Sequence, residues 1–105
     1  MMRRTLATFL IFVSISASLH GGTPAENLTK NPDHWFSSDE GRHAVACILS
    51  WQSEHGDWPK NTDTTNIKFT GDRTKLKGTF DNGATIGELR ALARAFRVTG
   101  DESYR

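Results

Sequence analysis

The stretch ATIGELRALARAFRVTG, residues 84–100, decides the fold, because it has the pattern of one long amphipathic helix. Thr85 and Glu88 stand three residues apart, which is the spacing of a capping box at a helix N-terminus. Apolar residues then recur at helical spacing: Ile86, Leu89, Leu92, Ala93 and Phe96. We therefore expect a helix that begins at Ala84 or Thr85 and ends at Val98.

A second amphipathic helix is expected upstream, from Ser38 to Gln52. Ser37 and Glu40 have capping-box spacing. The apolar stripe consists of Ala44, Val45, Ile48 and Leu49, with Gln52 at its end. Downstream, Gly100 suits a helix C-terminus, and residues 101–103 have the composition of a further helix start. These elements predict an all-α fold.

The first residues have the pattern of a secretory signal peptide. Arg3 and Arg4 precede the uncharged, largely apolar run from Leu6 to Ala17, which is followed by small residues. This run is shorter than the roughly 20 apolar residues that a membrane-spanning helix needs. We expect residues 1–19 to be a cleaved signal peptide, the mature chain to be secreted or periplasmic without stable membrane insertion, and residues 20–30 to be a flexible lead-in.

Charge and cysteine content exclude several classes of protein. The chain has 13 basic and 12 acidic residues, so it is nearly neutral and lacks the one-sided basic surface of a nucleic-acid binder. Cys47 is the single cysteine, so no intrachain disulfide forms. Neither Cys47 nor the histidines show the spacing of a zinc site. These histidines are His34, His43 and His55, three of the four in the chain.

Two short polar strings hold the candidate site residues. In GDWPKN, residues 56–61, proline fixes its own backbone and favours extended geometry before it, so that Trp58, Lys60 and Asn61 are presented on a stiff, non-helical segment. In TFDNGAT, residues 79–85, an Asp-Asn-Gly turn leads into a helix. This turn sets the carboxylate of Asp81 and the amide of Asn82 at a helix N-terminus. Together these groups suit a site for uronate sugars.

Both strings, together with NPDHW at residues 31–35, resemble the N-terminal part of the family 10 pectate lyases, or pectic acid lyases. The resemblance runs from Asn31 to the last residue and includes VTGDESYR, residues 98–105. It implies that residues 31–105 are the incomplete N-terminal part of an (α/α) toroid of helix pairs. The family usually has a second glycine where this chain has Asp57, and a left-handed backbone suits aspartate less well than glycine.

The resemblance also implies an activity. The complete domain would cleave polygalacturonate by calcium-assisted β-elimination and release unsaturated oligogalacturonides. The family uses an arginine as the base, and that arginine is expected beyond Arg105, so the activity of these 105 residues alone stays open. By resemblance, Asp81 contacts calcium or the calcium-bound substrate. The residues implied in substrate binding are Trp58, Lys60, Asn61 and Asn82.

The residues of the two strings also have purely structural interpretations. Asp81 suits a helix cap and Asn82 suits a turn, while a lone lysine such as Lys60 is commonly a solvated surface charge. Trp58 is at least as well placed to pack between the helices as to stack on a sugar. Asp63 and Asp72 lie in the loop between the helices and are possible calcium ligands.

Two other functions are compatible with the sequence. One is a helical-toroid glycoside hydrolase that uses Glu54 and Asp57, although an acid and a base must straddle the glycosidic bond. The other is a non-catalytic pectin-binding module that uses Lys60, Trp58 and Arg94. Arg94 belongs to an arginine stripe on the outer face of the second helix, which we expect to be solvated. The stripe comprises Arg90, Arg94 and Arg97.

Overall fold

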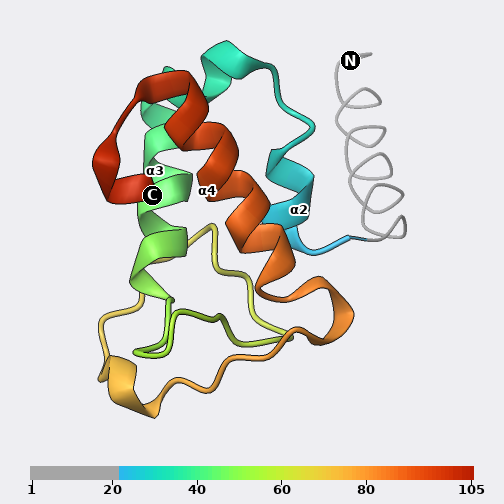
Figure 1. Cartoon of the computed structure of the whole chain (residues 1–105), viewed down its shortest axis with the longest axis vertical. Coiled ribbons are helices and arrows are strands. Elements are labelled where there is room, and N and C mark those ends of the chain that lie inside the picture. Colours follow the sequence, from blue (N-terminus) through green and yellow to red (C-terminus); the bar gives the residue numbers. More distant parts are fainter. Residues whose placement is uncertain (1–21) are drawn as a thin grey trace, which may run out of the picture.

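Residues 22–105 are described by a computed structural model of the chain (Figure 1). They contain three α-helices and four 3-10 turns, and no strand occurs in this range. The helices are α2 (Pro24–Leu28), α3 (Asp39–Ser50) and α4 (Ile86–Thr99). The turns are η1 (Asp33–Ser37), η2 (Arg73–Lys75), η3 (Asp81–Gly83) and η4 (Glu102–Tyr104). The all-α prediction agrees with these elements, while the toroid stays a prediction and the signal peptide lies outside the described residues.

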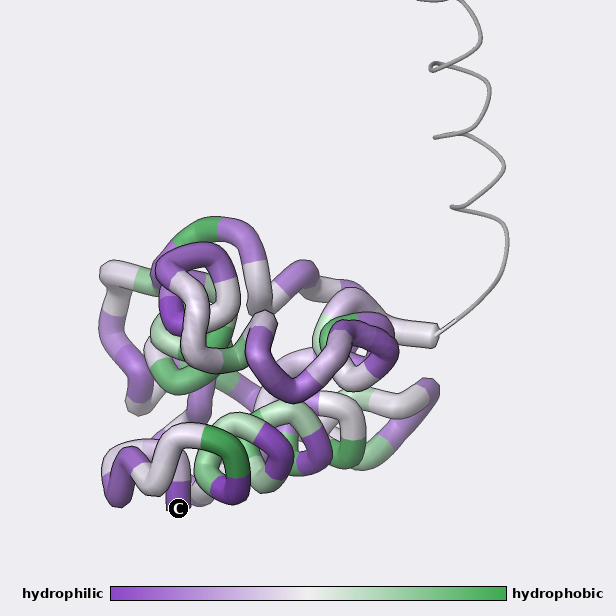
Figure 2. Tube along the Cα trace, turned by 90° about the horizontal axis from the view of Figure 1, so that it is seen from above, coloured by the Kyte–Doolittle hydropathy of each residue, from purple (hydrophilic) through white to green (hydrophobic). Residues whose placement is uncertain are grey.

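Helix α4 forms where its sequence predicts a helix, although Ile86, Leu89 and Ala93 of the predicted apolar stripe are exposed. The N–H of Thr85 donates to Oε1 of Glu88 over 2.9 Å, so the expected capping-box pair stands at the helix start. Gly100 ends the helix with a φ of 72°, and its N–H donates to the carbonyl of Phe96 over 2.8 Å. Hydrophobic and hydrophilic positions alternate along the helical turns in Figure 2. The buried apolar face of α4 consists of Ala91, Leu92 and Ala95.

Helix α3 begins one residue away from the predicted cap. The hydroxyl of Ser38, not Ser37, accepts the N–H of Gly41 over 3.1 Å. Glu40 is therefore not part of a capping box, and its carboxylate accepts the indole N–H of Trp35 over 2.8 Å. A Cβ at residue 41 would collide with the carbonyl of Trp35, so the close approach of η1 to α3 requires glycine there. The helix also ends at Ser50 rather than at Gln52.

The segment predicted as a flexible lead-in contains helix α2. Thr23 and Glu26 form a reciprocal capping box, with N–H to side-chain distances of 2.8 and 3.1 Å. Ala25 is 1% exposed and belongs to the same hydrophobic cluster as the buried face of α4. Gly87 of α4 lies so close to α2 that a Cβ there would stand 2.7 Å from Cγ of Glu26. The prediction of flexibility is wrong from Pro24 to Leu28 because capping and packing both order this helix.

Arg94 ties the N-terminal segment to α4. Its guanidinium donates to Oδ1 of Asp33 over 2.6 Å and to the carbonyls of Thr29 and Asn31 over 3.0 and 2.9 Å. It also lies 5.0 Å from the ring centroid of Phe36, within range of a cation–π interaction. The expectation of a solvated arginine is wrong at this position. The guanidinium already donates hydrogen bonds to groups of the protein itself, and this argues against a pectin contact through Arg94.

Residues 51–85 connect α3 to α4 without an α-helix of their own, as the lower part of Figure 1 shows. Side chains tie this long connection to the helices. The indole N–H of Trp58 donates to the carbonyl of Ile48 over 2.7 Å, and that of Trp51 donates to the carbonyl of Ile67 over 2.8 Å. These bonds give an irregular segment a defined path. No helix within residues 22–105 has the length and apolar character that crossing a membrane requires.

Candidate functional site

Lys60 and Asp81 form an ion pair that joins the two polar strings. Nζ of Lys60 lies 3.0 Å from Oδ2 of Asp81, across a sequence separation of 21 residues. The two side chains are 46% and 55% exposed. The pair is therefore open to solvent, and a ligand can reach it without any movement of the core.

The backbone brings the two strings side by side. The N–H of Thr79 donates to the carbonyl of Trp58 over 3.0 Å, just before the two members of the ion pair. Asn61 and Asn82 both take the left-handed conformation, with φ values of 57° and 54°. Each asparagine directly follows one member of the pair and turns the chain there, a conformation that asparagine tolerates better than most residues. Both asparagines are exposed.

Asp81 does not cap α4. The helix begins at Ile86 with Thr85 at the N-cap, while Asp81 opens the separate turn η3. The carboxylate of Asp81 instead accepts the hydrogen bond from Lys60. The interpretation of Asp81 as a helix cap is therefore wrong.

Trp58 is a packing residue in this structure. Its side chain is fully buried, and its indole N–H is bonded to the carbonyl of Ile48. Trp58 also belongs to the hydrophobic core between α3 and α4. No face of the ring is open to a sugar, so direct stacking on substrate does not fit this conformation.

Phe80 is a site candidate that the sequence interpretation missed. It directly precedes Asp81 and is 65% exposed. The signal was available in the string TFDNGAT, where a large apolar residue stands among polar ones. An exposed aromatic ring beside a charged pair offers an apolar surface for a sugar ring.

Two carboxylates proposed for other roles are engaged locally. Asp57 accepts a hydrogen bond from the hydroxyl of Ser53 and is only partly exposed. The positive φ of this turn, 91°, belongs to Gly56, and Asp57 does not need a left-handed backbone. Glu54 is exposed and lies 3.5 Å from His55. Because Asp57 is already bonded to Ser53, the arrangement offers little support for a hydrolytic Glu54–Asp57 pair.

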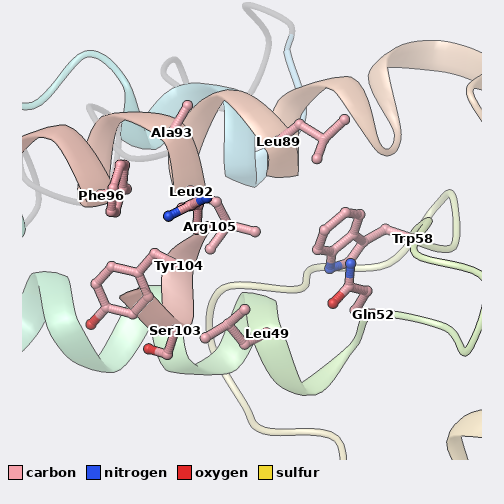
Figure 3. A pocket seen from close by; sticks show the side chains of 10 residues that line it. All are labelled: Leu49, Gln52, Trp58, Leu89, Leu92, Ala93, Phe96, Ser103, Tyr104 and Arg105. Atoms are coloured by element: carbon pink, nitrogen blue, oxygen red, sulfur yellow. The ribbon is translucent and has the colours of Figure 1, made fainter. Parts of the chain in front are cut away.

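An apolar groove of about 330 Å³ lies between α3 and α4, apart from the ion pair (Figure 3). Its walls include Leu49, Leu89 and Phe96, and Tyr104 of η4 stands beside them. Arg105 contributes the charged group at this groove. Such a lining does not suit a polyanionic sugar, because most of it offers no partner for carboxylates.

Cys47 and His43 are neighbours on α3 but do not form a reactive pair. Sγ of Cys47 lies 3.5 Å from Nε2 of His43. The thiol is fully buried, and burial raises the pKa of Cys47. A raised pKa disfavours the thiolate that nucleophilic chemistry requires.

Comparison with known families identifies the chain. The family model of pectic acid lyase matches residues 52–105, which include both polar strings and α4. The chain belongs to the pectic acid lyase family. The match begins later than the predicted resemblance, which started at Asn31 and included residues 31–35. No curated protein and no solved structure matches the chain.

Pectic acid, the substrate that this family name gives, is a chain of uronates with one carboxylate on each sugar. The site residues of this pectic acid lyase chain can be compared with that chemistry. An ammonium group has three N–H donors, and Asp81 takes one of those of Lys60. The remaining donors suit a substrate carboxylate.

The pectic acid lyase family generally uses calcium, but residues 22–105 do not provide a complete calcium site. In residues 22–105 no three carboxylate, imidazole or thiol groups are placed to hold a metal ion. Calcium takes about 6–8 oxygen ligands, whereas Asp81 provides one carboxylate that already faces an ammonium group. Asp63 and Asp72 accept N–H groups of their own loops over 2.9 and 3.0 Å. The described residues therefore do not fit a calcium site by themselves.

Proposed function

We propose that this chain binds polygalacturonate through Lys60, and that this contact serves β-elimination when the lyase site is complete. The observation that carries the proposal is the exposed Lys60–Asp81 pair, which unites the two polar strings inside the matched region. An ammonium group recognises carboxylates by charge and hydrogen bonding together. Non-catalytic pectin binding and turnover both begin with this contact.

Asp81 prepares Lys60 for binding. A free lysine side chain loses up to about 2 kcal/mol of rotamer entropy when it is fixed. The hydrogen bond to Asp81 restricts Nζ before any ligand arrives, so that less entropy is lost on binding. The cost of this arrangement is that Asp81 repels an approaching carboxylate. We therefore expect moderate affinity for one uronate and stronger binding to a chain of several.

Lys60 can also contribute to the chemical step. β-Elimination removes the C5 proton of a uronate, and negative charge then develops toward the neighbouring carboxylate. A cation held at that carboxylate stabilises the charge more in the transition state than in the ground state. Calcium, when bound to substrate in the complete site, would add further charge neutralisation.

Export is part of the proposal, because pectate is an extracellular polymer. It is supported by Arg3 and Arg4 followed by the apolar run from Leu6 to Ala17. N-terminal sequencing of secreted material tests it. A mature N-terminus between Ala17 and Gly22 is expected, whereas recovery of intact Met1 would contradict signal-peptide cleavage.

A binding measurement on the chain tests the proposed function. Oligogalacturonate should bind in calorimetry, and its affinity should fall as ionic strength rises. The fully methyl-esterified oligomer is the matched control, because it keeps the sugars and removes the charges. Equal affinity for both oligomers would overturn carboxylate recognition. Release of ultraviolet-absorbing unsaturated uronide would add catalysis to binding.

A further inference from the structure

Glu88 is a buried carboxylate that connects two distant segments. Its side chain is 2% exposed. Oε1 accepts the N–H of Thr85 over 2.9 Å, and Oε2 accepts the hydroxyl of Thr64 over 2.8 Å. Capping of α4 requires only the first of these bonds. The second bond spans 24 residues and reaches the loop that carries Lys60.

Thr85 makes a second connection to the same loop. Its Oγ1 accepts the N–H of Trp58 over 2.9 Å and donates to the carbonyl of Thr79 over 2.7 Å. The residue is 1% exposed and has φ 70° and ψ −49°. A positive φ is rare for a β-branched residue and persists only where the surroundings enforce it. Here the surrounding hydrogen bonds do so.

These hydrogen bonds hold the chain on both sides of Lys60 and on both sides of Asp81. Lys60 lies between the tied positions Trp58 and Thr64, two residues before it and four after it. Asp81 lies between Thr79 and Thr85 at the same two offsets. Both charged side chains are exposed, yet the backbone on each side of them is attached to buried groups.

We propose that Thr64, Thr85 and Glu88 form a brace that positions Lys60 against Asp81 and so directs Lys60 toward a uronate carboxylate. The three are positioning residues, because buried side chains do not touch substrate themselves. The role in uronate binding rests on the proposed function, while the placement of the ion pair does not. The paired substitutions Thr64→Val and Thr64→Ser separate the hydroxyl from the volume of the side chain.

Carbodiimide cross-linking tests the brace without any ligand. The reagent converts the carboxylate of Asp81 to an O-acylisourea, and Nζ of Lys60 attacks it to form an amide. The reagent leaves as its urea, which carries away the carboxylate oxygen, so that the mass of the chain falls by that of one water. Mass spectrometry of the digested chain gives the yield. Thr64→Val should lower the yield several-fold, Thr64→Ser should retain it, and Thr70→Val, at an exposed threonine of the same connection, should leave it unchanged. An unchanged yield in Thr64→Val would overturn the brace.

Glu88→Asp provides a second variant if Thr64→Val does not fold. The shorter side chain keeps its charge but cannot reach Thr85 and Thr64 together, so the yield should fall. Amide hydrogen exchange of α3 reports whether the core persists in each variant. Retention of the full yield in a folded Glu88→Asp chain would also contradict the brace.

A double-mutant cycle then tests the consequence for binding. Oligogalacturonate affinity is measured for the unaltered chain, Lys60→Gln, Thr64→Val and the double variant. Positioning predicts that Lys60→Gln costs much less affinity once Thr64 is altered, whereas additive losses would show that Thr64 does not act through Lys60. If the unaltered chain binds no oligogalacturonate, the proposed function fails, and cross-linking still decides the placement of the ion pair.

Discussion

Lys60 and Asp81 face each other at 3.0 Å on the surface of the protein, and neither side chain belongs to the hydrophobic core. An exposed ion pair of this kind adds only about 0–1 kcal/mol to stability, because water and salt screen it. Substitutions at this pair can therefore change binding while the free energy of unfolding stays nearly the same. This separation makes the site testable.

Lys60→Gln should weaken oligogalacturonate binding and reduce its dependence on ionic strength, because one positive charge is removed from the site. The thermal midpoint should shift by no more than a few degrees, since the lost pair contributes about 0–1 kcal/mol. Calorimetry over a range of salt concentrations measures both the affinity and its dependence on ionic strength. Lys77→Gln, an exposed lysine in the same connection, is the control. Equal losses in the two variants would indicate only general attraction between the chain and a polyanion.

Asp81→Asn should lower turnover by a complete lyase carrying these residues far more than it lowers stability. The carboxylate holds Lys60 in place, whereas α4 is capped by Thr85 and Glu88. Release of unsaturated product, normalised to folded protein, is measured beside the thermal midpoint. A midpoint several degrees lower with unchanged turnover per folded molecule would assign Asp81 a purely structural role.

The two long helices were predictable because their signals are local. Periodic apolar residues and the Thr85–Glu88 pair act within one or two turns, so both helices form where they are predicted. Which apolar residues of α4 are buried depends on its neighbours, and Ile86 and Leu89 of the predicted stripe are exposed. The cap of α3 was not predictable in the same way, because Ser37 and Ser38 are equally good caps in isolation. The choice depends on how closely η1 approaches Gly41, which is a tertiary contact. Helix α2 was missed although Thr23 and Glu26 carry a capping-box pattern.

The candidate site was predictable in composition but not in arrangement. Sequence identified Lys60 and Asp81, yet their contact depends on the path of a long connection. The burial of Trp58 depends on the space between α3 and α4. Similarly, the spacing of Arg94 from Arg90 and Arg97 predicts a solvated helix face. Arg94 finds its hydrogen-bond acceptors only because the N-terminal segment passes over α4. Contacts between distant segments leave little trace in one sequence.

Arg94→Gln should destabilise the chain without changing oligogalacturonate affinity per folded molecule. Loss of the guanidinium leaves the carbonyls of Thr29 and Asn31 without their donors, which costs about 1–3 kcal/mol for each partly buried group that water cannot reach. We expect the thermal midpoint to fall by several degrees. Arg90→Gln, an exposed position on the same helix, is the control. Weaker binding with an unchanged midpoint would favour the pectin-contact interpretation of Arg94.

Acid should weaken the attachment of the N-terminal segment through Asp33. Hydrogen bonds from Arg97 and Arg94 hold the pKa of this carboxyl below its ordinary value. A lowered folded-state pKa stabilises the protein above the unfolded-state pKa of about 4, and this contribution disappears as pH falls through the folded-state value. Asp33→Asn should therefore lower the midpoint at neutral pH and flatten its decline below about pH 4. If the midpoint of Asp33→Asn falls with pH as steeply as that of the unaltered chain, Asp33 is not a main cause of the loss of stability in acid.

Phe80→Ala should weaken oligogalacturonate binding several-fold while leaving the ionic-strength dependence unchanged. The substitution removes an exposed aromatic face beside Asp81 but no charge, so only the contribution from buried apolar area is lost, about 25 cal/mol per Å². The thermal midpoint should not fall, because the 65% exposed ring packs little against the core. Ile67→Ala is the matched control, since Ile67 is 71% exposed and lies in the same connection. If Phe80→Ala and Ile67→Ala bind the oligomer as tightly as the unaltered chain, Phe80 is not a sugar platform and Lys60 acts without an aromatic neighbour.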